Sequence, residues 1–110
     1  MKTHVVKFVE KIAACPGDRK HAKRLHKDIE ALCFLCDALG DKVVIDLDGG
    51  PGYAASFLEE LFGGLVRKKG CGLGLLIDLE MLSFISNDEP HLIEEIRRFV
   101  NEAEMDRCNE

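Results

Sequence analysis

Apolar and polar residues follow two different periods along the chain. Short runs rich in β-branched and apolar residues, typical of strands, occur at residues 4–9 and 42–47, and residues 80–86 end in a third. Between and after these runs, apolar residues recur every three or four positions. This spacing predicts helices that reach Leu39, run from Ser56 to Lys69, and follow Asp88. Residues 72–79 fit either a strand or a short helix.

The alternation of strands and helices predicts the fold class. We expect an α/β protein in which residues 1–110 form one small domain. Its central sheet should be mostly parallel, with about three or four strands and three main helices, because crossover helices join parallel strands. The run at 42–47, KVVIDL, is continuously apolar, which is typical of a strand buried on both faces.

The first helix has one apolar side, which contains a C-x-x-C pair. At 100° per residue, six side chains fall within one arc: Ala22, Leu25, Ile29, Leu32, Cys33 and Cys36. We therefore expect Cys33 and Cys36 to be buried and free of metal, since no second pair completes a tetrahedral site. Phe34 points away from this arc and is either covered by a neighbouring segment or exposed for a partner.

Local signals predict the helix ends. Ser56 and Glu59 fit an S-x-x-E capping box, in which the hydroxyl accepts a hydrogen bond from the Glu59 amide. Asp88 is predicted to cap the last helix, with Pro90 in its first turn. The Gly63–Gly64 pair in the middle of the second helix suggests that another backbone comes close, from within the domain or from a partner.

Composition and charge exclude several classes of protein. The net charge of −5 argues against a protein that coats nucleic acid. No apolar run approaches the roughly 18 residues that span a bilayer, and the first residues are too charged for a signal peptide, so we expect a cytoplasmic protein. Five cysteines, an odd number, favour free thiols. A basic run accompanied by His21 and His26 is either a solvated face or a surface for an acidic partner; it contains Arg19, Lys20, Lys23, Arg24 and Lys27.

Asp46 and Asp48 raise the question of catalysis. An apolar strand ending in D-x-D-G resembles the first motif of haloacid-dehalogenase phosphatases, in which two carboxylates and Mg²⁺ transfer a phosphoryl group. Gly50, however, replaces the usual threonine, and no later Lys and acidic pair completes the set. The alternative is that the carboxylates accept backbone N–H bonds in the following loop. We therefore predict no catalytic residue, no enzyme activity and no cofactor, with Mg²⁺-dependent phosphoryl transfer kept as the alternative.

The glycine-rich segment Gly49-Gly50-Pro51-Gly52 precedes the second helix. Such loops can cradle phosphate, which leaves a small-molecule or nucleotide sensor as a further alternative. No Gly-Lys-Ser/Thr follows, and Glu59 and Glu60 would repel an anion. A tight connection between strand and helix is the simpler interpretation.

Two longer segments resemble a known family. VVIDLDGGPGYAASFLEELFGGLVRKKG and LSFISNDEPHLIEEIRRFVNEA resemble the bacterial STAS-like α/β domains, a family of unknown function. That family is similar to the STAS anti-sigma-factor antagonists, which are non-enzymatic switches. In those proteins a kinase of the histidine-kinase-like ATPase fold phosphorylates a serine before the second helix. Here Ala55 stands at that position, so Ser56, one residue later, is an unfavoured phosphosite.

The resemblance implies a function in protein binding. We expect a signalling or regulatory module that binds a histidine-kinase-like ATPase or another regulator, without contact to membrane or nucleic acid; a homodimer is also compatible. The expected surface is the loop 49–56 with the start of the second helix. It comprises Gly49, Gly50, Pro51, Gly52, Tyr53, Ser56, Phe57 and Glu60.

Overall fold

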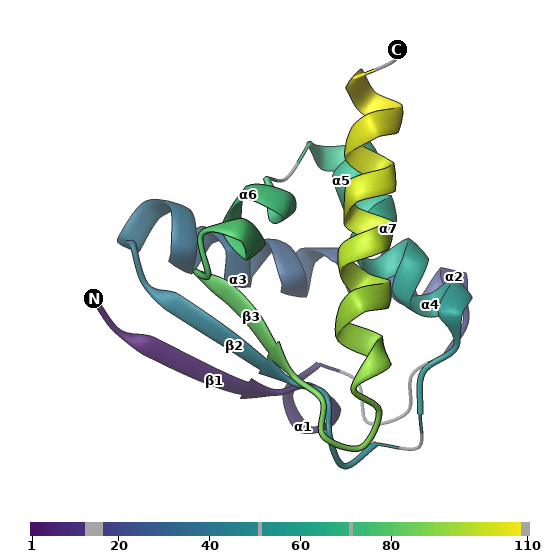
Figure 1. Cartoon of the computed structure of the whole chain (residues 1–110), viewed down its shortest axis with the longest axis horizontal. Coiled ribbons are helices and arrows are strands. Elements are labelled where there is room, and N and C mark those ends of the chain that lie inside the picture. The colour runs from purple at the N-terminus through teal and green to yellow at the C-terminus, as the bar shows by residue number, and fades with distance from the viewer. Residues whose placement is uncertain (13–16, 51, 71, 109–110) are drawn as a thin grey trace.

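A three-stranded parallel sheet lies beside a group of helices in the computed structural model (Figure 1). The structure describes residues 1–12, 17–50, 52–70 and 72–108. The strands are β1 (Thr3–Lys7), β2 (Lys42–Asp46) and β3 (Leu82–Ile85), in the order β1-β2-β3, and both pairs are parallel. The predicted α/β class and parallel sheet are confirmed.

Helices fill the connections between the strands, and the last helix follows β3. They are α1 (Phe8–Lys11), α2 (Arg19–Arg24), α3 (His26–Leu39), α4 (Ala55–Leu58), α5 (Leu65–Lys69), α6 (Leu73–Asp78) and α7 (His91–Cys108). A π-helical segment, η1 (Glu59–Gly64), joins α4 to α5, so residues 55–69 form one continuous helix, which we call the central helix. No helix within the described residues is long and apolar enough to cross a membrane.

The first strand is shorter than predicted. It ends at Lys7, and residues 8 and 9 turn into α1. Lys7 pairs with Asp46, the last residue of β2, so the ladder offers no partner beyond it. Phe8 instead leaves the sheet and is fully buried, with its ring edge-on to Tyr53 and Phe57 at centroid distances of 5.4 and 6.2 Å.

The first predicted helix is divided in two. Leu25 separates α2 from α3 with φ −91° and ψ −3°, and its N–H bonds to the carbonyl of Ala22, three residues back. The apolar arc nevertheless stays on one side across the break: Ala22, Leu25, Ile29, Cys33 and Cys36 are buried and Leu32 is half-buried. The periodicity therefore predicted the packing, although it did not reveal the break.

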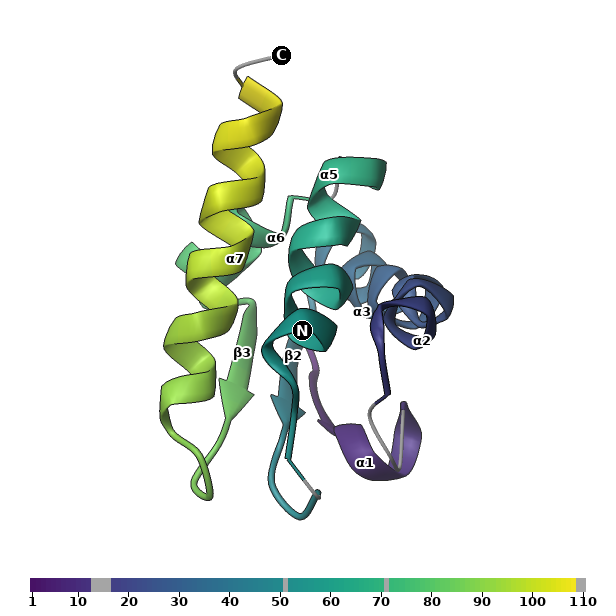
Figure 2. The same cartoon turned by 90° about the vertical axis from the view of Figure 1, so that its right-hand side faces the viewer.

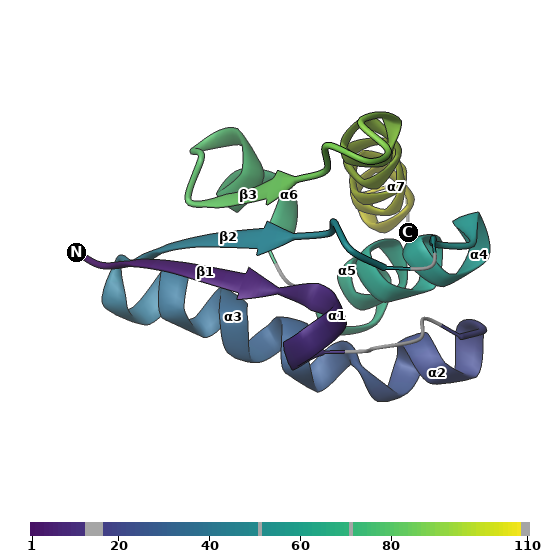
Figure 3. The same ribbon diagram turned by 90° about the horizontal axis from the view of Figure 1, so that it is seen from below.

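The sheet is covered by helices mainly on one face, which corrects the expectation that β2 is buried on both. In parallel strands, paired residues point to the same face. Val43 and Ile45 are fully buried, whereas Val44 between them is half-buried and its partner Val5 is 62% exposed. Figure 3 shows α3 along one side of the sheet.

The central helix is the most buried element. It lies between α7 on one side and α2 on the other (Figure 2). Six apolar side chains along it are fully buried: Phe57, Leu58, Leu61, Phe62, Leu65 and Val66. A Cβ at Gly63 would stand 3.2 Å from the carbonyl oxygen of Phe99 in α7, so the second backbone expected at the glycine pair comes from within the domain.

In the last third of the chain, the structure decides between strand and helix for residues 72–79 and shifts the start of the last helix. Residues 73–78 are helical, as α6, and Glu80 then takes a left-handed conformation with φ 60° before β3 begins. Helix α7 starts at His91, so Asp88 does not cap it and Pro90 precedes it. The Asp88 carboxylate instead accepts the N–H of Gly49 at 3.1 Å.

Candidate functional site

The carboxylate of Asp48 joins the loops that follow β2 and β3. Its Oδ1 accepts the backbone N–H groups of Asn87 at 2.7 Å and Asp88 at 2.9 Å, and its Oδ2 accepts the Asn87 side-chain amide at 3.0 Å. Together with the bond from Gly49 to Asp88, these contacts fasten the two loops to each other. The Asp48 carboxylate therefore accepts backbone N–H groups of a loop, which is the role that the sequence offered as the alternative to catalysis.

Asp46 and Tyr53 brace the same loop from inside. Asp46 Oδ1 accepts the N–H of Asp48 at 3.0 Å, and the Tyr53 hydroxyl donates to the carbonyl of Leu47 at 3.1 Å. Burial raises the pKa of Tyr53 to about 12, and the negative charges of Asp46, Asp48 and Glu89 add to this shift.

The loop 49–56 differs in exposure along its length. Gly49 and Gly52 have positive φ angles of 85° and 109°, which favour glycine. Gly49, Gly50 and Ser56 are exposed, while Gly52 and Tyr53 are half-buried. Pro51 lies outside the described residues.

Two residues of the expected binding surface are covered. Phe57 is fully buried, and Glu60 is only 6% exposed. Both point into the contacts of the central helix with α2 and its neighbours, so the surface left for a partner is the loop and the first turn of α4. The helical periodicity of the sequence places Phe57 on the apolar side of its helix, and this position indicates that the side chain is buried.

Ser56 does not form the predicted capping box. Helix α4 begins at Ala55, and its N-cap is Ala54, with no side-chain hydrogen bond at the cap. Ser56 is thus exposed inside the first turn, and Glu59 contacts arginines instead of reaching back. The phosphosite at Ser56 stays an untested prediction.

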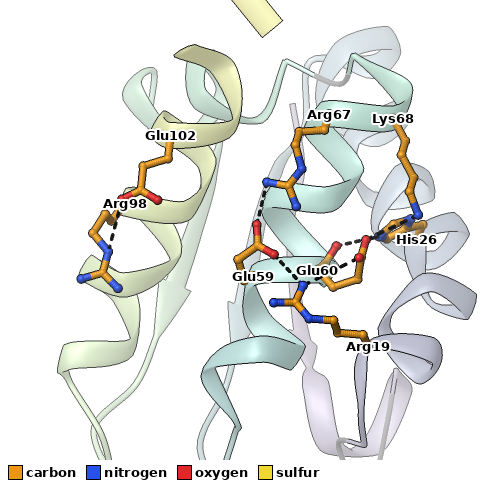
Figure 4. Close-up of polar contacts among 8 residues, drawn as sticks. All are labelled: Arg19, His26, Glu59, Glu60, Arg67, Lys68, Arg98 and Glu102. Atoms are coloured by element: carbon orange, nitrogen blue, oxygen red, sulfur yellow. Dashed lines mark hydrogen bonds and ion pairs between the residues drawn. The ribbon is translucent and has the colours of Figure 1, made fainter. Parts of the chain in front are cut away.

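Glu59 holds two arginines from different parts of the chain (Figure 4). Its Oε1 accepts Arg19 Nη1 at 2.7 Å, and its Oε2 lies 2.6 Å from Arg67 Nη1. The hydrogen bond from Arg67, followed by that from Arg19, keeps the pKa of Glu59 below its ordinary value. The contact with Arg19 ties α2 to the central helix. Arg67 was not singled out from the sequence, because its partner lies eight residues away along a π-helical stretch.

Glu60 and His26 form a buried contact beside this pair. His26 Nε2 donates to the backbone carbonyl of Glu60 at 2.7 Å and lies 3.5 Å from its Oε2. Lys68 Nζ approaches the same oxygen at 3.7 Å, while Arg19 Nη1 lies 3.9 Å from Oε1 (Figure 4). Glu60 Oε2 accepts no hydrogen bond from the described residues. His26 accompanies the basic run in the sequence, whereas the structure buries it between α3 and the central helix.

The C-x-x-C thiols lie in the core, as predicted. Both are buried, and the Cys36 thiol donates to the carbonyl of Met81 at 3.6 Å. Burial is the main cause that raises the pKa of the Cys36 thiol. Within the described ranges, no group of three or more His, Cys, Asp or Glu side chains could hold a metal ion. Cys15 and Cys71 lie outside those ranges.

Comparison with known proteins gives one match. A family model described as a STAS-like domain of unknown function covers residues 21–71. Residues 21–71 of this chain are STAS-like. The matched residues run from α2 through β2 and the loop 49–56 to the end of the central helix, which are the elements that build the site above. No curated protein and no solved structure matches the chain.

Proposed function

We propose that this STAS-like domain acts by binding another protein through the exposed part of the loop 49–56 and the first turn of α4. The observation that carries the proposal is the hydrogen bonding of Asp46 and Asp48. A loop fastened in this way offers a preformed surface, and preformed surfaces bind without the entropic penalty of ordering.

The alternative of Mg²⁺-dependent phosphoryl transfer has less support. That chemistry needs Asp46 as an available nucleophile and Asp48 as an acid or base. Asp48 instead accepts three hydrogen bonds from the β3 loop, and Asp46 accepts the N–H of Asp48. These contacts favour a structural role for both carboxylates.

The family resemblance suggests the partner. We propose an ATPase or kinase-like regulator in a signalling system, because STAS domains that resemble this chain are controlled by such proteins. We propose that this interaction takes place in the cytoplasm.

Affinity purification from the native host tests the surface. Ala55→Arg places a large cation at the exposed first residue of α4, and Asn101→Arg makes the same type of change at an exposed position of α7. We expect a partner to be retained by the unmodified chain and by Asn101→Arg but lost by Ala55→Arg. Retention by both variants would contradict the proposed surface. Mg²⁺-dependent turnover of a phosphate ester that disappears in Asp46→Asn would contradict the binding function itself.

A further inference from the structure

The side of α2 and α3 that faces away from the core carries an ordered row of exposed side chains. We call this row the outer stripe: Lys20, Lys23, Arg24, Lys27, Ala31, Phe34 and Ala38. Its spacing of three and four residues places it opposite the buried arc that contains Ala22, Ile29 and Cys33. Figure 3 shows α2 and α3 following one another along the lower edge of the view, with no other labelled element beyond them.

The first half of the outer stripe is basic, with Arg24 near enough to the exposed carboxylate of Asp18 to interact with it electrostatically. Arg19, Arg67 and Lys68 contact Glu59 or Glu60, but the four cations of the stripe make no ion pair with any described residue. Lys20 and Lys27 stand in the first turns of α2 and α3, where the helix dipole disfavours positive charge, whereas Lys23 and Arg24 stand in the last turn of α2. A local excess of cations in a chain of net charge −5 creates a surface that attracts carboxylates.

The second half of the stripe is apolar. Phe34 is 61% exposed and is flanked along the stripe by Ala31 and Ala38, whose small side chains leave its ring accessible. Aromatic side chains bury a large area and often dominate the energy of protein interfaces. The stripe therefore offers an electrostatic half and an aromatic anchor on one helical face.

We propose that the outer stripe binds an acidic, amphipathic helix of a partner protein. Carboxylates of that helix would lie along Lys23 and Lys27, and an apolar side chain would cover Phe34. The stripe shares no residue with the loop 49–56, so this interaction does not depend on the proposed function of that loop.

The surroundings of the stripe favour a protein over a phosphate-rich polymer or a membrane. The exposed carboxylate of Asp37 and the half-buried Glu30 lie on α3 beside the apolar half, where they would repel phosphates. A membrane-bound helix presents several large apolar residues to the lipid. Here Phe34 is the one large apolar side chain of the stripe.

A designed peptide tests the proposal directly. The probe is a fluorescent helical peptide that carries glutamates and leucines on one face, titrated with the whole chain while its anisotropy is followed. We expect saturable binding that weakens between about 0.05 and about 0.3 M salt, because contacts between exposed charges are screened.

Charge reversal and truncation separate the two halves of the stripe. Lys23→Glu combined with Lys27→Glu should weaken binding at least about tenfold, and Phe34→Ala should weaken it about fivefold. The matched control, Lys11→Glu combined with Lys42→Glu, reverses two exposed lysines elsewhere and should leave the affinity unchanged. Circular dichroism verifies that each variant is folded.

Three results would overturn the proposal. They are the absence of peptide binding, an equal loss in the control variant, and tighter binding of duplex DNA or of vesicles containing phosphatidylserine than of the acidic peptide.

Discussion

The carboxylate of Glu60 lies directly over Gly64 on the same helix. A Cβ at position 64 would stand 2.7 Å from Cδ of Glu60 and would overlap its Oε2, although the backbone angles of Gly64, φ −61° and ψ −37°, suit any residue. Gly64 therefore provides space for the Glu60 carboxylate, and its backbone conformation does not call for glycine. Its hydrogen side chain lets a buried carboxylate fold back along the helix toward His26 and Lys68.

This contact predicts that Gly64→Ala destabilises the domain. The gain in helix propensity, about 1 kcal/mol, should be outweighed by overpacking, so the free energy of unfolding should fall by about 1–2 kcal/mol. In a Glu60→Ala background the same change should be neutral or stabilising, and urea unfolding of the double-mutant cycle measures the difference. Gly72→Ala is the control, because nothing lies within 4 Å of a Cβ there. Additive effects of Gly64→Ala and Glu60→Ala would show that the two side chains are independent.

The absent capping box gives a second prediction. Ser56→Ala should change the free energy of unfolding by less than about 0.5 kcal/mol, because the hydroxyl bonds to no backbone N–H at the start of α4. Asp18→Ala should lower the melting temperature, since the Asp18 carboxylate accepts the N–H of His21 at 3.1 Å and caps α2. Thermal unfolding compares the two variants, and a larger loss for Ser56→Ala would restore Ser56 as a cap.

Glu59 should contribute to acid unfolding. Its pKa is lowered in the folded protein by the hydrogen bonds from Arg67 and Arg19, so its stabilising contribution is complete at neutral pH. The contribution should begin to fall near the ordinary value of 4.5 and disappear as the pH drops through the lowered pKa. Urea midpoints between pH 7 and pH 2 should therefore be less pH-dependent in Glu59→Gln than in the unmodified chain. Glu94→Gln, an exposed carboxylate without an ion pair to the described residues, should keep the original profile.

Tyr53 gives a spectroscopic prediction in the alkaline range. It is the single tyrosine of a chain without tryptophan, so ultraviolet absorbance reports its ionisation alone. The folded protein should show a pKa of about 12, against 10.0 for an ordinary phenol. Because the folded pKa is raised, the stability that Tyr53 contributes is complete below pH 10 and is lost as the pH rises toward 12. A native titration centred near 10 would show that the hydroxyl is open to water.

The sequence predicted those parts of the fold that depend on local patterns. The helical periodicity after Asp88 and the apolar run at 42–47 extend over enough positions to be recognised, and the structure places α7 and β2 there. The break at Leu25 and the early end of β1 depend on contacts between distant segments, which periodicity does not contain.

In the candidate site, too, the sequence predicts local features but not the contacts between distant residues. The sequence offered a loop acceptor as one role for Asp48, because residues after a buried strand often accept loop N–H groups. It did not reveal that the donors are Asn87 and Asp88, which lie about forty residues later. Ser56 satisfied a sequence motif, yet the helix begins at Ala55, two residues before the first helical position that the motif requires.

The central helix has a consequence for how the domain unfolds. It contacts α2 from the first part of the chain and α7 from the last, and its apolar side chains are shielded on nearly every side. Its amide hydrogens can exchange with water only when one of those neighbours detaches, and each detachment exposes the core. The slowest hydrogen exchange should thus fall on residues 61–66, and proteolysis that removes α7 should unfold the remaining domain instead of leaving a stable fragment.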